Sequence, residues 1–183
     1  MTVLNELHQD HVNLHKLLAV LANKLAKLRR GETPNFMLLA DAVDYIGNYA
    51  DRYHHPREDE MYHYFHQILN HPDVTQAIER CMDDHQALKK YGDELIEAVN
   101  CILNDAVVPM DAFANKLEAF LEHQVAHLNL EEATLFPLLE ANVTQEQWAA
   151  LEGKLPKIDD PLFGEQQKER YLTLYAELLK DAR

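Results

Sequence analysis

The chain has 183 residues, with 31 acidic and 17 basic side chains and a formal charge of −14 when histidine is neutral. This length suffices for one domain with a substantial core. The charge argues against partners such as nucleic acid or an anionic membrane surface, because phosphate binding needs clustered Lys and Arg. Only 5 glycines and 7 prolines, with abundant Leu, Ala, Glu and Gln, favour an all-α chain over any β-sheet.

The N-terminal segment, MTVLNELHQDHVNLHKLLAVLANKL, carries charges and histidines throughout. It therefore lacks the uninterrupted apolar run of a signal peptide or membrane span, and we expect a cytoplasmic protein. Cys81 and Cys101 fall within one predicted helix, ~30 Å apart along its axis. That separation is too large for a disulfide, so no disulfide framework is expected.

Start and stop signals predict four long helices, at about 2–30, 33–70, 73–104 and 110–139. The first runs from about Thr2 and stops at Gly31, and the second opens at Thr33 and Pro34, a capping residue followed by proline. After the fourth helix, the sequence from Thr144 to Gln147 is a capping box. The loop PKIDDPLFG then precedes GEQQKERYLTLYAELLK, which predicts a last amphipathic helix.

Four long helices with short connections predict an antiparallel up-down-up-down four-helix bundle over about 2–140. The two shorter segments form a C-terminal helical extension over about 144–183. No linker, repeat or low-complexity tract divides the chain, so we expect a single domain spanning 1–183.

Ionisable side chains interrupt the apolar stripe of every long helix. His11 takes a core position in the first helix and His85 takes one in the third. The second and fourth helices each carry a His-x-x-x-Glu pair on the inward stripe, and these pairs are His54/Glu58 and His127/Glu131. Off the stripes we expect His8, His15, His123 and Glu132.

Pro56 lies inside the second predicted helix. It removes a backbone hydrogen bond and kinks the helix, so we expect the phase of the apolar stripe to slip slightly near residue 54. With this phase, His55, Asp59 and Glu60 are expected not to face the core.

Antiparallel geometry places the six inward residues at one level. His11 and His54 are each about 20 residues from the turn at Gly31, hence ~30 Å from the same end of the bundle. Similar counting around the next two turns makes Glu58 level with His85, and His85 level with His127. All four helices therefore contribute to one cross-section.

Two carboxylates and four imidazoles in one apolar layer would cost several kcal/mol per uncompensated ion, so a cation is expected there. Histidine and glutamate at i and i+4 form a two-point clamp, and two clamps suit two metal ions bridged by carboxylates. Mixed imidazole and carboxylate ligands favour iron or manganese, although copper and zinc compete for nitrogen ligands. The alternative, satisfied core histidines with solvated acids, requires spacing, face and height to coincide by chance.

The motifs QDH ending at His11, HHPRED beginning at His54, MDDH ending at His85 and HLNLEEATLFPLL beginning at His127 resemble those of hemerythrin-like, or HHE cation-binding, proteins. The likeness spans residues 1 to about 140, and DDPLFG with the helix after it is similar to an extension common in bacterial members. The resemblance implies a centre of two non-haem iron ions bridged by Glu58 and Glu131. It places His11 and His54 on one iron, and His85 and His127 on the other.

The chain departs from this pattern at Cys81. Oxygen-carrying hemerythrins have a further histidine there, one turn before the third-helix ligand. Its absence leaves room for a small ligand on both irons, similar to bacterial proteins that repair damaged iron–sulfur clusters and handle nitric oxide. His8, His15 or His123 would supply the missing ligand if the register were off by one.

We therefore expect a protein that binds or reacts with O2 or NO in sensing, stress response or iron-centre repair. One alternative is a di-iron oxidase- or peroxidase-type enzyme that uses a phenol from Tyr45, Tyr49, Tyr53, Tyr62 or Tyr64. Another is a non-redox bundle held by zinc or manganese whose surface binds a partner. The native metal, the oligomeric state and any protein partner stay open.

Overall fold

The computed structural model describes residues 3–156, 159–164 and 169–181, and within them every regular element is helical. The prediction of an all-α protein is confirmed. Most of the chain forms four helical rods, and the predicted start of the first at Thr2 lies outside the described residues. The rods are α1 (Val3–Arg29), α2 (Phe36–Tyr45) continued by η1 (Ile46–His54) and α3 (His55–Ile68), α4 (Pro72–Leu103), and α5 (Met110–Leu130) continued by η2 (Glu131–Leu135) and α6 (Phe136–Asn142).

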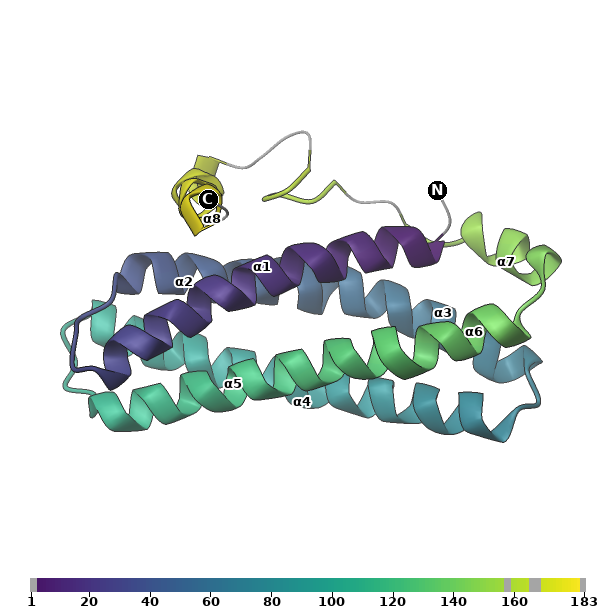
Figure 1. The fold of residues 1–183 in the computed structure, drawn as a ribbon, viewed down its shortest axis with the longest axis horizontal. Coiled ribbons are helices and arrows are strands. Elements are labelled where there is room, and N and C mark those ends of the chain that lie inside the picture. The colour runs from purple at the N-terminus through teal and green to yellow at the C-terminus, as the bar shows by residue number, and fades with distance from the viewer. Residues whose placement is uncertain (1–2, 157–158, 165–168, 182–183) are drawn as a thin grey trace.

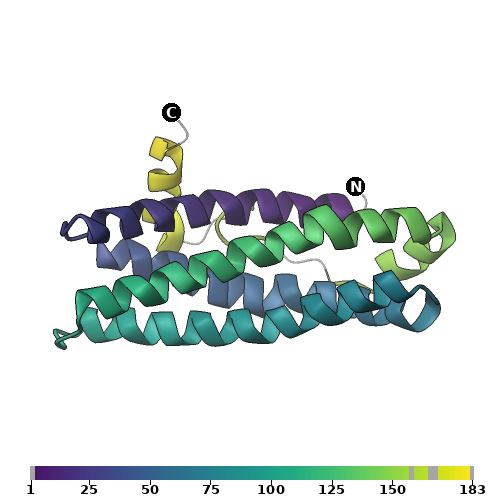
Figure 2. The same ribbon diagram turned by 60° about the horizontal axis from the view of Figure 1, so that its bottom comes forward.

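The four rods lie side by side along the long axis of the molecule, and the chain reverses direction at each connection (Figure 1; Figure 2). Helix α5 packs against both α1 and α4, and α4 packs against α2 and α3. Apolar faces of all four rods thus meet along a common axis. Among the described helices, none combines the length and the apolar character that a membrane span requires.

The turn after α1 forms as its sequence predicts. Gly31 has a φ of +77°, in the left-handed region that glycine adopts at little cost. The N–H of Glu32 donates to the Lys27 carbonyl at 3.0 Å, which satisfies one of the last carbonyls of the helix. The start of the second rod differs from expectation: Asn35, not Thr33, caps α2, since its side chain accepts from the Leu38 N–H at 3.1 Å.

The second and fourth rods each contain a π-helical segment, where backbone bonds run from i to i+5. The predicted phase slip near residue 54 is real, but it is a π-helix over Ile46–His54 that ends two residues before Pro56. The segment Glu131–Leu135 ends in the same way before Pro137 and was not predicted. Proline lacks an N–H and its ring clashes with the carbonyl four residues earlier, and a wider turn relieves both problems.

The core consists of two apolar clusters. One, containing Leu14, Leu21 and Phe120, fills the half nearer the Gly31 turn. The other, containing Leu7, Phe65 and Leu139, fills the opposite half. His11 lies on α1 between Leu7 and Leu14, so a polar layer separates the two clusters.

The C-terminal extension packs onto both clusters. It contains α7 (Gln145–Glu152), a 3-10 turn (Glu169–Tyr171) and α8 (Leu172–Asp181). The capping box at Thr144 is confirmed, with its side chain accepting from the Gln147 N–H and the Gln147 side chain accepting from the Thr144 N–H. Leu162 and Leu174 are buried in the first cluster and Leu151 in the second. The first residues of the predicted last helix, 165–168, lie outside the described part.

Candidate metal centre

All six residues expected to face inward do so, and they meet in the polar layer. His11, His54, His85 and His127 are at most 5% exposed, and Glu58 and Glu131 are fully buried. The Nε2 atoms of His11 and His54 lie 3.1 Å apart. The off-stripe histidines His8, His15 and His123 are exposed, as expected.

Each buried carboxylate lies near histidines on both sides of this layer, with His11 and His54 on one side and His85 and His127 on the other. Glu58 Oε1 lies 3.2 Å from His11 Nε2 and 3.3 Å from His54 Nε2, while its Oε2 lies 3.5 Å from His85 Nε2. Glu131 Oε2 lies 3.3 Å from the Nε2 atoms of both His11 and His127, and its Oε1 lies 3.6 Å from His85 Nε2. Each carboxylate therefore lies between histidines of different rods.

The expectation for His55 is wrong. Its side chain is 3% exposed, and its ring stacks on His85 with centroids 4.4 Å apart. The π-helical segment explains the error, because a wider turn brings two consecutive side chains, His54 and His55, to the core side. Of its two companions, Asp59 is half-buried and Glu60 is exposed.

A carboxylate lies near the Nδ1 atom of every buried histidine in the layer. Each long rod contributes an acid that faces the histidine of another rod, so the contacts form a ring. The oxygen to Nδ1 distances are 3.1 Å for Asp10 and His54, 2.8 Å for Asp59 and His85, 3.9 Å for Asp84 and His127, and 2.7 Å for Glu132 and His11. The third is too long for a hydrogen bond, and the other three orient their imidazoles.

Sequence reasoning missed these four acids, although a signal was present. Each is adjacent in sequence to one of the six inward residues, as in Asp10-His11, Asp84-His85 and Glu131-Glu132. On a helix, an adjacent residue points to the neighbouring rod instead of the centre. One acid on each rod, next to an inward-facing residue, therefore indicates a ring of histidine supports.

Neighbouring histidines stabilise the two buried carboxylates of the layer in their charged form. Burial would raise the pKa of Glu58, but His54 and His11 hold it well below its usual range. Burial would also lower the pKa of His11, yet hydrogen bonds to Glu132 and Glu58 raise it to about 10. In the metal-free protein, protons on histidine thus supply positive charge that a metal ion would otherwise provide.

Several polar atoms at the centre are buried without a hydrogen-bond partner. They are Nε2 of His55, His85 and His127, and Oε2 of Glu58 and Glu131. Buried polar atoms without a partner are rare in folded proteins, and a group of them fits a cation site. Two sets of ligand atoms each lie within 4.8 Å of one another: His11, His54 and Glu58; and His55, Glu58, His85 and His127. The donor set, imidazole and carboxylate without thiolate, suits iron or manganese.

Two further buried side chains, those of Tyr62 and Cys81, lie at the layer. Tyr62 is fully buried, and its hydroxyl donates to Glu131 Oε1 at 2.6 Å. Burial and Glu131 raise its pKa well above the usual range, so the phenol keeps its proton. Cys81 is also buried and its thiol pKa is raised by burial. Both cysteines are free thiols, which agrees with the expected lack of a disulfide.

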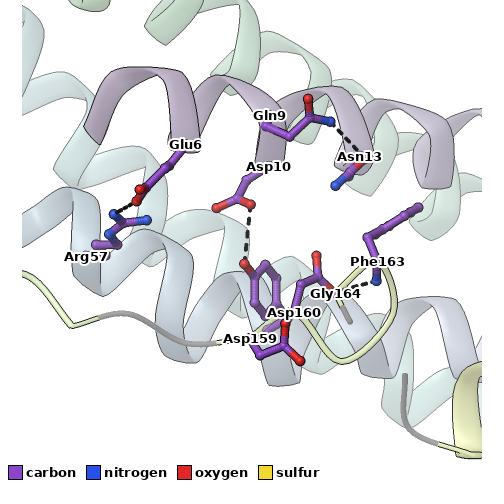
Figure 3. A pocket seen from close by; sticks show the side chains of 10 residues that line it. Glu6, Gln9, Asp10, Asn13, Arg57, Asp159, Asp160, Phe163 and Gly164 are labelled. Carbon is purple, nitrogen blue, oxygen red and sulfur yellow. Dashed lines mark hydrogen bonds and ion pairs between the residues drawn. The ribbon is translucent and has the colours of Figure 1, made fainter. Parts of the chain in front are cut away.

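Three cavities approach the layer from outside. A cavity of about 160 Å³ is lined by His55 and His85, with Gln86 and Lys89 among its other residues. Another, of about 20 Å³, touches His54 and Asp10. The third, of about 350 Å³, lies between α1 and the C-terminal extension, and Asp10 points into it across from Asp160 (Figure 3).

The hemerythrin HHE cation binding domain family matches this chain over residues 2–139. The match covers the four rods except the last three residues of the fourth, and every residue of the buried layer, and the chain belongs to this family. Neither the curated proteins nor the solved structures contain a significant match. The family and the buried His/Glu cluster together define a metal-binding protein of the hemerythrin-like class.

Proposed function

We propose that this chain is a non-haem di-iron protein that binds or reacts with a small diatomic ligand, O2 or NO, in sensing, stress response or iron-centre repair. We further infer that its rods form the antiparallel up-down-up-down four-helix bundle, because consecutive rods are joined by short turns. The proposed metal ligands are His11, His54, Glu58, His85, His127 and Glu131. The observation that carries the proposal is that two fully buried carboxylates each lie within 3.6 Å of histidines on both sides of the layer.

The chain's own residues would prepare the centre before any ligand arrives. Glu132, Asp10 and Asp59 fix three imidazoles by their Nδ1 atoms, so that Nε2 points at the metal positions. The apolar clusters on either side exclude water. Two iron ions, when bound, would supply the electrons with which a diatomic molecule is held or reduced.

The two cavities that touch buried histidines are small, which supports a small ligand. The cavity that reaches His55 and His85 holds about 160 Å³, well below the ~300 Å³ at which pockets for larger organic ligands begin. A diatomic molecule can enter such a space. Tyr62 holds a proton at its hydroxyl oxygen beside Glu131.

The same tyrosine favours a second candidate function, a di-iron oxidase- or peroxidase-type enzyme. Among the tyrosines named from the sequence, Tyr62 bonds directly to a proposed ligand, while Tyr49 bonds to Asp10 at 3.3 Å. A redox-active phenol is useful to an enzyme that oxidises a substrate in single-electron steps. A non-redox bundle held by zinc or manganese remains the third candidate.

The test is to load the full chain with ferrous iron under anaerobic conditions and admit NO or O2 while following the visible spectrum. We expect a spectral change that saturates with NO and oxidation of the centre with O2. The Glu131→Ala variant, which lacks a bridging carboxylate, should show a much weaker change. An iron-loaded wild-type protein whose spectrum ignores both gases would contradict the proposal and favour the non-redox candidate.

A further inference from the structure

We propose that His55 is a fifth imidazole ligand and binds the metal ion held by His85 and His127. The inference rests on the proposed metal pair and specifies how its two positions differ. It changes the expectation drawn from Cys81, since the imidazole absent from α4 would be supplied by the second rod.

His55 also has a carboxylate near its Nδ1, from its own rod and not from a neighbouring one. Its Nδ1 lies 3.2 Å from Asp51 Oδ1, one turn earlier, and the Asp51 side chain is itself only 7% exposed. Its Nε2 is buried and has no hydrogen-bond partner. A carboxylate at Nδ1 and an orphaned Nε2 describe a metal ligand better than a packing residue, because a packed histidine would bond both nitrogens.

The position of the ring identifies which metal it would bind. Its centroid lies 4.4 Å from that of His85 and 5.5 Å from that of His127. Ligand atoms of His55, His85, His127 and Glu58 all lie within 4.8 Å of one another. His54, the preceding residue, belongs instead to the set with His11 and Glu58. Two consecutive histidines therefore serve opposite sides of the layer.

The histidines that sequence reasoning offered as replacements do not reach the layer. His8 is exposed and contacts Glu132 on its outer side, and His123 is exposed with its Nδ1 at 2.7 Å from the Ala119 carbonyl. His15 is also exposed. Within the described residues, His55 is thus the histidine beyond the original four that has an orphaned nitrogen at the centre.

An unequal pair of metal positions follows. One metal would have two imidazoles, from His11 and His54, and the other would have three. Because the second is more completely ligated, a small ligand should prefer the first, and we expect one ligand per pair. The competing reading is that His55 only forms an apolar wall against His85.

The His55→Phe variant distinguishes these two readings, because it keeps an aromatic ring and removes the ring nitrogens. We would titrate the metal-free full chain anaerobically with ferrous iron, comparing wild type, His55→Phe and His55→Ala with His63→Ala, an exposed histidine on the same helix. If His55 is a ligand, both His55 variants bind one of the two iron ions at least ~10-fold more weakly, whereas His63→Ala matches wild type. A wall predicts that His55→Phe matches wild type.

Two further readouts guard against misfolding. Free imidazole should restore the binding of that ion in His55→Ala, since the 160 Å³ cavity opens on this position. Mössbauer spectra of the ferrous protein should show two unlike irons in wild type and more similar ones in His55→Ala. Wild-type affinity in His55→Phe, or an unrescued His55→Ala with an unchanged spectrum, would overturn the role of His55. Failure of wild type to bind two ions would instead overturn the proposed function.

Discussion

The buried layer repeats one arrangement. A histidine has a carboxylate beside one ring nitrogen, and its other ring nitrogen faces the centre of the layer. His11 shows this most clearly, because Glu132 lies 2.7 Å from its Nδ1 while Glu58 and Glu131 lie 3.2 and 3.3 Å from its Nε2. A histidine surrounded by carboxylates in this way requires a positive charge that balances them. In the metal-free protein a proton supplies that charge, and in the proposed metal-loaded protein the ion does.

Removing either of the two proposed bridging carboxylates should lower both metal content and stability. We expect Glu58→Ala and Glu131→Ala to lose bound metal, and with it the stabilisation that a ligand of the folded state provides, ~2.7 kcal/mol at a hundredfold excess over Kd. His15→Ala and His123→Ala alter exposed histidines and serve as controls. Metal analysis and thermal unfolding measure the two effects. Equal losses in all four variants would show that the inward faces are misassigned.

The supporting acids should matter almost as much as the ligands. We expect Glu132→Ala to lower metal affinity by ~10–100-fold, because His11 loses the hydrogen bond that fixes its ring. The control is Glu122→Ala, an exposed glutamate on α5. Competition with a chelator of known affinity measures the change. Indistinguishable affinities for the two variants would exclude an orienting role for Glu132.

The stability of the metal-free protein should fall at alkaline pH. The pKa of His11 is raised from 6.5 to about 10 in the folded protein, so its protonated form stabilises the fold fully below pH 6.5 and this contribution is lost as the pH rises towards 10. His85, whose pKa is also raised, acts in the same direction. Thermal unfolding near both pH values should show the fall in the metal-free protein and little change after metal is added. A higher unfolding temperature at the alkaline value would contradict this.

At the scale of secondary structure, two π-helical segments position proposed ligands on the second and fourth rods. One ends at His54 and the other begins at Glu131, so each has one end in the polar layer. The proline that follows each segment disfavours the tighter α-helical pairing. In α6, which follows the second segment, Leu139 is fully buried while Leu138 is only partly so.

Replacing the first of these prolines should loosen the site more than the fold. In Pro56→Ala a backbone N–H becomes available to the residue 52 carbonyl, which allows the segment to tighten and turns His54 and His55 away from their positions. We expect a several-fold loss of metal affinity with a small change in thermal stability. Pro72→Ala, also an exposed proline in the first turn of a helix, is the control. Equal affinities in the two variants would show that Pro56 does not maintain the π-helix.

For the molecule as a whole, the periodicity of the apolar residues was sufficient to predict the four rods and the six inward side chains. Counting from the turns was sufficient to place them at one level, because an α-helix rises by a constant amount per residue. His55 and the ring of acids were not predicted. A π-helix changes the angle between neighbours, and an acid that faces a histidine on another rod leaves no periodic signature of its own.

The number of metal ions in the layer tests the central claim most directly. The full chain should be purified from its native host, analysed for metals, and crystallised for anomalous scattering at the iron edge. We predict about two ions per chain, mainly iron, one beside His11 and His54 and the other beside His85 and His127. A single ion in the layer, or none when metal is supplied in excess, would contradict the account.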